Sequence, residues 1–220
     1  DCLETPQSDA LRHVFFAERR AAKFPGVPRA SGGVDILGIA GDGTQATGIA
    51  LAALQAGLRV VFFQPEPRAR KAAQDRVTRR LEKDAARRAK PVETLRPLLD
   101  RITFTGDVAA LRDAQIVVET MTGSVDEKRA FYTQVGPHLT SDTVLASDAA
   151  HHDLKALVDA SGRADRFLGL RFFAPADRMK LLEVVPGPWA AGEAQARVLH
   201  MARRLGKRPV WAGLGPGFVA

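Results

Sequence analysis

The sequence predicts an α/β protein built on a mostly parallel sheet, and three observations lead to that prediction. Short apolar segments alternate with amphipathic ones along most of the chain, as in strand–helix–strand units. A glycine-rich turn over residues 38–46 joins the first such strand to the first such helix. The composition, with 45% apolar and 26% charged residues in 220, is that of an ordinary globular domain. We therefore expect helices on both faces of the sheet.

The expected strands are short and apolar, as strands buried on both faces are. They cover residues 34–40, 58–63, 102–105, 116–119, 144–147, 167–172, 180–185 and 208–211. The expected helices cover residues 8–23, 44–56, 126–135, 152–160 and 193–205, and a long basic segment reads as two more helices broken near Pro91. That segment would form a helical arm inserted after the second strand.

The first 33 residues are expected to lie outside the sheet. Ser8 can cap a helix over residues 8–23, in which apolar residues recur at helical spacing. Prolines and glycines make residues 24–33 a linker. We expect residues 1–33 to be a linker helix and linker, and residues 34–220 to be the sheet domain.

The glycine-rich turn has the spacing G-x-G-x-x-A between a strand and a helix. Gly41 permits the tight turn, Gly43 lets the backbone approach a pyrophosphate, and Ala46 keeps the helix close to the sheet. The helix N-terminus attracts the anion. The sequence therefore predicts a Rossmann-like, doubly wound, dinucleotide-binding domain.

The end of the second strand departs from that pattern. An acidic residue there normally binds the adenosine ribose, whereas this chain has Gln64, with Glu66 two residues later. An amide binds a hydroxyl without charge assistance and hence more weakly. Asp42 lies in the turn itself, where a carboxylate repels a pyrophosphate unless it points away.

The net charge of +7 is concentrated in one segment of the chain. Residues 68–101 hold twelve basic and five acidic residues, so the rest of the chain is neutral overall. This balance favours an anionic partner such as nucleic acid, a membrane surface or a phosphorylated ligand, and the alternative is a solvated helix face. Aromatic residues are absent between the basic ones up to Phe104, which argues against base stacking and a nucleic-acid partner.

Several classes of protein are excluded. No apolar run approaches the ~18 residues of a membrane span, and no signal-peptide pattern is visible, so a cytoplasmic protein is expected. The single cysteine, Cys2, excludes an intrachain disulfide and a multi-cysteine metal site, and no metal is expected.

From about Val34 to Val219 the chain resembles the NAD-binding domain of the 3-hydroxyacyl-CoA dehydrogenases of fatty-acid β-oxidation. The resemblance rests on motifs that occur in order: the glycine turn, Val118-Glu119, Lys128, and the segments 145–147, 169–175, 179–185 and 215–219. Residues 10–19 resemble the linker helix of multifunctional members, in which an enoyl-CoA hydratase domain precedes and a C-terminal helical domain follows. The resemblance implies an NAD cofactor, an acyl-CoA ligand and one domain of a larger protein.

In that family a His accepts the hydroxyl proton while a hydride moves from C3 to NAD, and a Glu twelve residues later orients the imidazole. This chain has Arg171 at the His position and keeps Glu183. The family's Ser and Asn positions are Ala150 and Ala174. Because the pKa of Arg exceeds ~12, Arg171 cannot be a general base. We therefore expect an Arg171–Glu183 ion pair and a catalytically impaired domain.

The resemblance also assigns cofactor-binding residues. They are Gly41, Gly43, Ala46, Gln64, Lys128 and Asp148, of which Asp148 stands in the family's Asn-Thr-Ser segment. Gly123 stands where the family's cofactor loop has a Glu. His151 and His152 follow that segment, and they are either a relocated base or exposed loop histidines.

In the family the helical arm contacts CoA, and the resemblance places Arg80 and Arg87 at contacting positions. Guanidinium groups suit the phosphates of CoA, while a solvated face or a contact with another domain remain alternatives. Two functions therefore compete: an active dehydrogenase domain, and a non-catalytic scaffold or acyl-CoA-binding domain that supports an attached enoyl-CoA hydratase.

Overall fold

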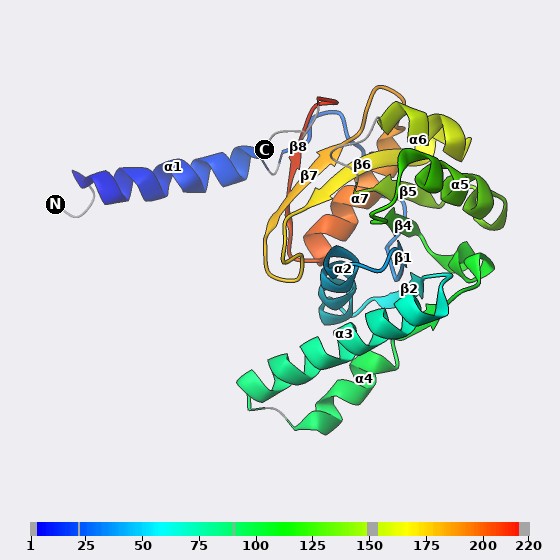
Figure 1. Cartoon of the computed structure of the whole chain (residues 1–220). Coiled ribbons are helices and arrows are strands. Elements are labelled where there is room, and N and C mark those ends of the chain that lie inside the picture. The colour runs from blue at the N-terminus through cyan, green and yellow to red at the C-terminus, as the bar shows by residue number, and fades with distance from the viewer. Residues whose placement is uncertain (1–3, 22, 90, 149–153, 216–220) are drawn as a thin grey trace.

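A single eight-stranded sheet forms the body of the domain in the computed structural model, which describes residues 4–21, 23–89, 91–148 and 154–215 (Figure 1). The strand order is β3-β2-β1-β4-β5-β6-β7-β8. Strands β1 to β6 are parallel, β7 is antiparallel to β6, and β8 is parallel to β7. The strands are β1 (Ile36–Ala40), β2 (Arg59–Phe63), β3 (Ile102–Thr105), β4 (Ile116–Glu119), β5 (Val144–Ser147), β6 (Phe167–Phe172), β7 (Leu181–Val185) and β8 (Arg208–Trp211).

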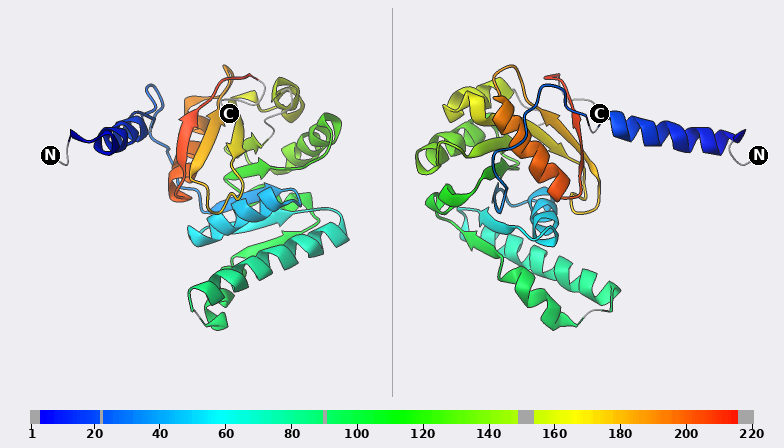
Figure 2. Two further views of the ribbon diagram at one scale, coloured as in Figure 1. Left: turned by 60° about the vertical axis from the view of Figure 1, so that its left-hand side comes forward. Right: turned by 180° about the vertical axis from the view of Figure 1, so that it is seen from behind.

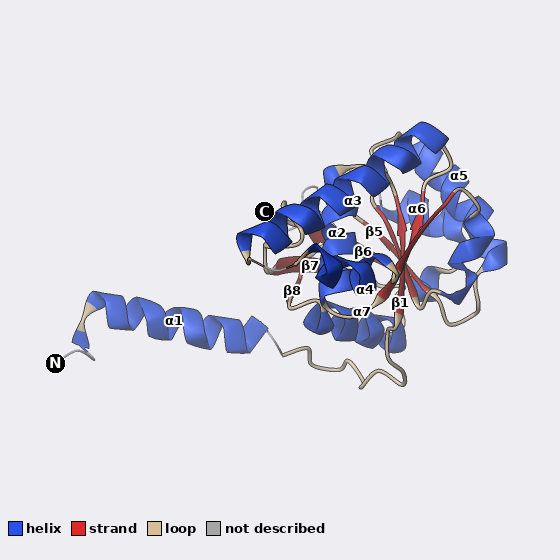
Figure 3. Ribbon diagram, turned by 90° about the horizontal axis from the view of Figure 1, so that it is seen from below, coloured by secondary structure: helices blue, strands red, loops and turns tan. Residues whose placement is uncertain are grey.

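Helices cover both faces of this sheet, as Figure 3 shows end-on. Helices α2 (Thr44–Gln55), α3 (Pro67–Arg87) and α7 (Gly192–Arg204) pack on one apolar cluster, and α5 (Val125–Val135) and α6 (Leu154–Ser161) pack on the other. Short segments complete the chain: α4 (Arg96–Leu99) and the 3-10 turns η2 (Val92–Leu95), η3 (Val108–Asp113), η4 (Gly136–His138) and η5 (Ala164–Arg166). The strand order reverses at β1 and β4, so a ligand crevice is expected at the carboxyl ends of these strands. The expected doubly wound fold is confirmed.

Helix α1 (Pro6–Ala21) stands apart from the sheet in the views of Figures 1 and 2. It begins before the expected position, and the amide of Ser8 donates to Thr5 Oγ1 at 3.2 Å. The prediction that Ser8 caps this helix is therefore wrong, because Thr5 accepts that hydrogen bond. None of its side chains is buried, and Arg208 of β8 forms an ion pair with Glu18 at 3.1 Å.

The arm is one long helix, α3, followed by η2 and α4. Its buried residues recur every four positions, Ala73, Val77, Leu81 and Ala85, so a narrow apolar stripe packs against α2 and the basic residues lie outside it. The Glu66 carboxylate caps the helix by accepting from the amides of Arg68 and Ala69. These two hydrogen bonds lower the pKa of Glu66 below its usual value.

Candidate functional site

The turn after β1 is shaped by Gly41, whose φ of +150° is a conformation that side chains disfavour. A Cβ on Gly41 would lie 2.4 Å from Thr120 Oγ1, at the end of β4. The amide of Thr120 donates to the carbonyl of Ala40 at 2.8 Å. Only glycine therefore lets the turn lie against the end of the neighbouring strand.

The N-terminus of α2 is open toward the crevice. Gly43 is its N-cap residue, and no side chain caps the helix there. A Cβ on Gly43 would meet only the amide of Gln45, at 4.0 Å, so the approach to the helix amides is free. Ala46 is fully buried, as expected for the residue that lets α2 lie close to the sheet. Uncapped amides at a helix N-terminus suit a phosphate group.

Asp42 of the turn is in contact with the arm, since its backbone carbonyl accepts a hydrogen bond from Arg76 of α3. This contact places a guanidinium beside the turn and offsets the negative charge that Asp42 contributes. The arm is therefore joined to the phosphate-binding turn through Arg76.

At the end of β2, the predicted ribose residue Gln64 uses Oε1 to accept the amide of Glu66 at 3.1 Å. The Glu66 carboxylate is occupied by the α3 cap. The group left to reach a ribose hydroxyl is the Gln64 side-chain nitrogen, which is uncharged.

Lys128 lies in a buried polar network rather than at the surface of the crevice. Its Nζ contacts Glu119 Oε1 at 2.6 Å and donates to the Met121 carbonyl at 2.5 Å. Ser147 Oγ donates to Glu119 Oε2 at 2.6 Å, and the Tyr132 hydroxyl lies 3.3 Å from the same oxygen. Burial, followed by the Glu119 charge, raises the pKa of Tyr132. Lys128 thus fixes the end of β4, and the network includes Tyr132 and Ser147, neither of which was among the predicted site residues.

Asp148, at the end of β5, faces the ends of α2 and β6. Its Oδ1 accepts the amide of Phe172 at 3.2 Å, and Gln45 Nε2 donates to the carbonyl of Phe172 at 2.5 Å. Desolvation is the largest influence and raises the pKa of Asp148 to about 6. Glu119 raises it further, whereas hydrogen bonds from Gln45 and Phe172 and the charge of Lys128 lower it.

Arg171 and Glu183 are directly paired across the antiparallel β6–β7 ladder. Arg171 Nη1 lies 4.0 Å from Glu183 Oε2, so they form the expected ion pair at a distance too long for a hydrogen bond. Glu183 is 1% exposed, and within the described part of the chain its Oε2 has no hydrogen-bond donor. The Arg171 guanidinium also lies over the Phe173 ring, 5.1 Å from its centroid. Ala150, His151 and His152 lie outside the described residues.

A basic cavity of about 290 Å³ lies between α3 and the start of α2, lined by Thr44, Thr47, Arg76, Arg79, Arg80 and Lys83. Arg80 Nη2 contacts Asp177 Oδ2 at 2.7 Å. Arg87 instead contacts Asp84 Oδ1 at 2.5 Å and lines a separate cavity of about 250 Å³. The structure therefore brings Arg80, and not Arg87, to the cavity beside the glycine turn.

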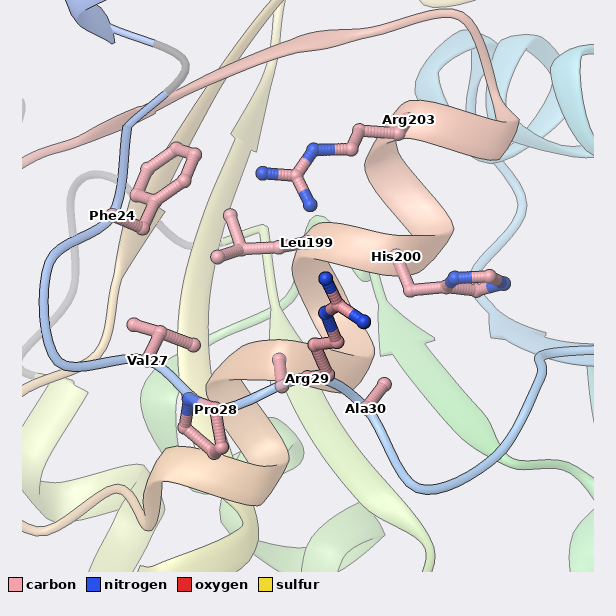
Figure 4. A pocket seen from close by; sticks show the side chains of 9 residues that line it. Phe24, Val27, Pro28, Arg29, Ala30, Leu199, His200 and Arg203 are labelled. Carbon is pink, nitrogen blue, oxygen red and sulfur yellow. The ribbon is translucent and has the colours of Figure 1, made fainter.

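Two larger cavities lie away from this turn. One, of about 400 Å³, lies between residues 24–30 and α7. Figure 4 shows its lining, which combines apolar side chains with Arg29, His200 and Arg203. The other, about 570 Å³, lies between α1 and the β7–β8 edge. The described residues contain no group of His, Cys, Asp and Glu that could hold a metal ion. They also contain no helix long and apolar enough to cross a membrane.

The comparisons with known proteins agree with this geometry. The family described as "3-hydroxyacyl-CoA dehydrogenase, NAD binding domain" matches residues 36–213. The chain belongs to this family. Its cofactor is NAD, and the uncapped α2 N-terminus with its open approach at Gly43 fits the pyrophosphate of that dinucleotide.

Relatives of this NAD-binding domain include longer proteins. The peroxisomal bifunctional enzyme of Danio rerio is 30% identical over an alignment of 222 positions, which covers 97% of this chain and 30% of that protein. The chain thus spans about 30% of the length of this curated relative. Among solved structures, FadB2 of M. tuberculosis has a TM-score of 0.81 at 30% identity, covering 86% of this chain and 67% of that one. The (S)-3-hydroxybutyryl-CoA dehydrogenase of Ralstonia eutropha has a TM-score of 0.80 at 28% identity, and the match covers 85% of this chain and 66% of that one.

Proposed function

We propose that this chain is the dehydrogenase-type domain of a multidomain fatty-acid β-oxidation protein, and that its own dehydrogenase step is impaired. The observation that carries the proposal is Arg171 paired opposite Glu183, where the resemblance implies a His–Glu dyad. In the family reaction, bound NAD accepts the hydride from C3 of a 3-hydroxyacyl-CoA. A protein group must take the hydroxyl proton in the same step.

Arg171 cannot take that proton, because a guanidinium carries only donors and stays charged at neutral pH. Glu183 cannot replace the base directly, since its side chain is 1% exposed and is paired with the Arg171 cation. Ala174 and Ala150 supply no polar atom for the substrate oxygen. The other side chains of the site can bind and position a ligand, but no side chain at the family's His position can accept the hydroxyl proton.

The intact parts of the site support ligand binding. Gly41, Gly43 and Ala46 keep the shape needed at the pyrophosphate, and Asp148 and Lys128 hold the ends of β5 and β4 in place. Gln64 gives the ribose an uncharged partner, so we expect weaker NAD binding than with an acid there.

We propose that the arm contacts acyl-CoA. The cavity beside the glycine turn has Arg76, Arg79, Arg80 and Lys83 in its lining and no acidic residue, so it suits the phosphate groups of CoA. Arg87, about two helical turns further along the same arm and beside a separate cavity, is the second CoA contact that the resemblance implies. This binding role is the alternative function: a scaffold or acyl-CoA-binding domain that supports an attached enoyl-CoA hydratase.

The partners within the same protein are a preceding enoyl-CoA hydratase domain and a C-terminal helical domain. The exposed apolar residues of α1, namely Leu11, Val14, Phe15 and Phe16, support a contact with other parts of the protein, since so many unburied apolar side chains on one helix mark an interaction surface. We expect the protein in the cytoplasm, whereas the curated relatives carry the word peroxisomal in their names. Imaging of the tagged full-length protein distinguishes the two compartments.

Calorimetry on the full-length protein tests the binding part of the proposal. CoA is expected to bind, and neutralising Arg80 and Arg87 to Gln should weaken it without lowering the melting temperature. NAD is expected to bind weakly, and micromolar affinity for NAD would contradict the loss inferred from Gln64 and Gly123. Unchanged CoA affinity in the double variant would make the arm a solvated face.

A further inference from the structure

Asp177 is a buried carboxylate that the family resemblance does not assign. It follows the β6 strand in the loop over residues 173–180, and its side chain is 2% exposed. Its Oδ2 accepts a hydrogen bond from Arg80 Nη2 of the arm at 2.7 Å, across 97 residues of sequence. Arg178 Nε lies 3.8 Å from the same oxygen. A charged pair with one partner this deeply buried fixes the geometry of both side chains.

The loop that presents Asp177 is itself held from two sides. Lys207 donates to the carbonyl of Ala176 and, at 2.7 Å, to the carbonyl of Met179. Gly48 of α2 approaches so closely that a Cβ there would lie 2.9 Å from the amide of Ala176. Asp177 therefore projects from a loop that is held on two sides, and its ion pair joins this loop to the arm.

A second contact repeats the connection one turn further along the arm. Arg178 Nη2 lies 3.6 Å from Asp84 Oδ1 of α3. Both pairs join α3 to the same loop, but only the Arg80–Asp177 pair includes a residue that lines the basic cavity. The guanidinium of Arg80 is thus aimed along the edge of this cavity by Asp177.

We propose that Asp177 is a positioning residue, which through Arg80 sets the arm helix against the loop after β6 and shapes the basic cavity for a phosphate-bearing ligand. This inference rests on the proposed acyl-CoA contact of the arm. Asp177 touches no ligand itself in this account; it acts by orienting Arg80.

The sign of one substitution separates positioning from simple electrostatics. Asp177→Asn removes a negative charge near an anion-binding cavity, so electrostatics alone predicts tighter binding of CoA. Positioning predicts the opposite, namely that CoA binding weakens about tenfold, or about 1.4 kcal/mol, since Arg80 is no longer held where it can contact a phosphate. NAD affinity should change less than CoA affinity, because the substitution reaches the glycine turn only through Arg76 of the arm.

The experiment measures CoA and NAD binding by calorimetry on full-length wild-type, Asp177→Asn, Arg80→Gln and double-variant protein. The double variant should bind CoA no more weakly than Arg80→Gln, because Asp177 acts only through Arg80. Asp75→Asn is the matched control, since Asp75 forms an exposed ion pair with Lys71 on the same helix at 2.5 Å. It should leave CoA affinity unchanged within twofold.

Hydrogen exchange of α3 without any ligand provides a second readout. Faster exchange of α3 amides in Asp177→Asn and in the milder Arg80→Lys, with α7 unchanged, is expected. Unchanged or tighter CoA binding in Asp177→Asn overturns the positioning role, and so does unchanged α3 exchange. If wild-type protein binds no CoA, the proposed acyl-CoA contact fails, while the exchange result still decides whether Asp177 positions the arm.

Discussion

Arg171 and Glu183 lie opposite each other in the β6–β7 ladder, with Nη1 and Oε2 4.0 Å apart. The buried carboxylate therefore lies beside a permanent cation, which cannot accept a proton at neutral pH. Glu183 Oε2 accepts no hydrogen bond from the described residues, which leaves it able to orient an imidazole. In the proposed account, this pair keeps the carboxylate of a His–Glu dyad without the imidazole that would accept the proton.

The proposed impairment predicts that introducing the polar groups of the family at these positions restores dehydrogenase activity. The triple variant Arg171→His, Ala150→Ser and Ala174→Asn is expected to oxidise NADH with acetoacetyl-CoA at least about a hundredfold faster than wild type, since a positioned general base contributes about 10²–10⁴. Adding Glu183→Ala to the triple variant is the control and should remove most of this gain. A triple variant that folds and binds NAD but gains nothing would show that another defect limits the domain.

The two glycines of the turn should behave differently. Gly41→Ala places a Cβ 2.4 Å from Thr120 Oγ1 at a φ of +150°, so it should destabilise the domain by about 1–3 kcal/mol. Gly43→Ala puts its Cβ into open space and should leave the melting temperature unchanged while weakening NAD binding, because the methyl group occupies the approach to the helix amides. Thermal melts and NAD titrations measure both effects. Equal stability of the two variants would contradict the assigned packing of Gly41.

Breaking the buried Glu119–Lys128 pair by removing only the cation should strongly destabilise the domain. Lys128→Met removes the cation from a carboxylate that is fully buried, and the uncompensated charge should cost about 3–5 kcal/mol in chemical denaturation. Lys155→Met is the matched control, because the Lys155–Asp159 pair at 2.9 Å is exposed. Its loss should lower the free energy of unfolding by less than about 1 kcal/mol. A small loss in Lys128→Met would mean that Ser147 and Tyr132 satisfy the carboxylate alone.

The contribution of Asp148 to the stability of the domain should fall as the pH rises from about 4 to about 6. Its folded pKa is raised to about 6, above the ordinary 3.8, so the folded state binds the proton more tightly than the unfolded chain. The contribution of Asp148 is full below pH ~4 and is lost as the pH passes ~6, about 3 kcal/mol at most. Asp148→Asn should remove this decline and be more stable than wild type at pH 7. Chemical denaturation at several pH values measures the free energy of unfolding of both proteins. If this free energy depends on pH in the same way in wild type and in Asp148→Asn, the raised pKa of Asp148 is refuted.

Local sequence signals predict most of the sheet but not the direction of every strand. The bounds expected for β3 to β6 and β8 agree with the structure, and the others differ by one or two residues. β7 runs antiparallel to β6, and nothing in its apolar pattern distinguishes it from a parallel strand. The direction is set by the short loop over residues 173–180, which leaves no room for a crossover helix.

In the candidate site, too, the sequence predicts the local motifs but not the contacts between distant residues. The glycine turn is a local pattern, and the structure places Gly41, Gly43 and Ala46 as that pattern implies. The contact between Arg80 and Asp177 joins positions 97 residues apart, and no periodicity or spacing signals such a pair. The role of Lys128 likewise depends on burial beside Glu119, which only the packing of α5 on β4 reveals.

The most direct test of the central claim is NADH oxidation with acetoacetyl-CoA by the full-length protein, compared with its Glu183→Ala variant. Any other domain with dehydrogenase activity contributes equally to both and cancels in the comparison. The account predicts that the two rates are the same within error, since Arg171 leaves Glu183 no base to orient. A wild-type rate well above that of Glu183→Ala would contradict it and make this an active 3-hydroxyacyl-CoA dehydrogenase domain.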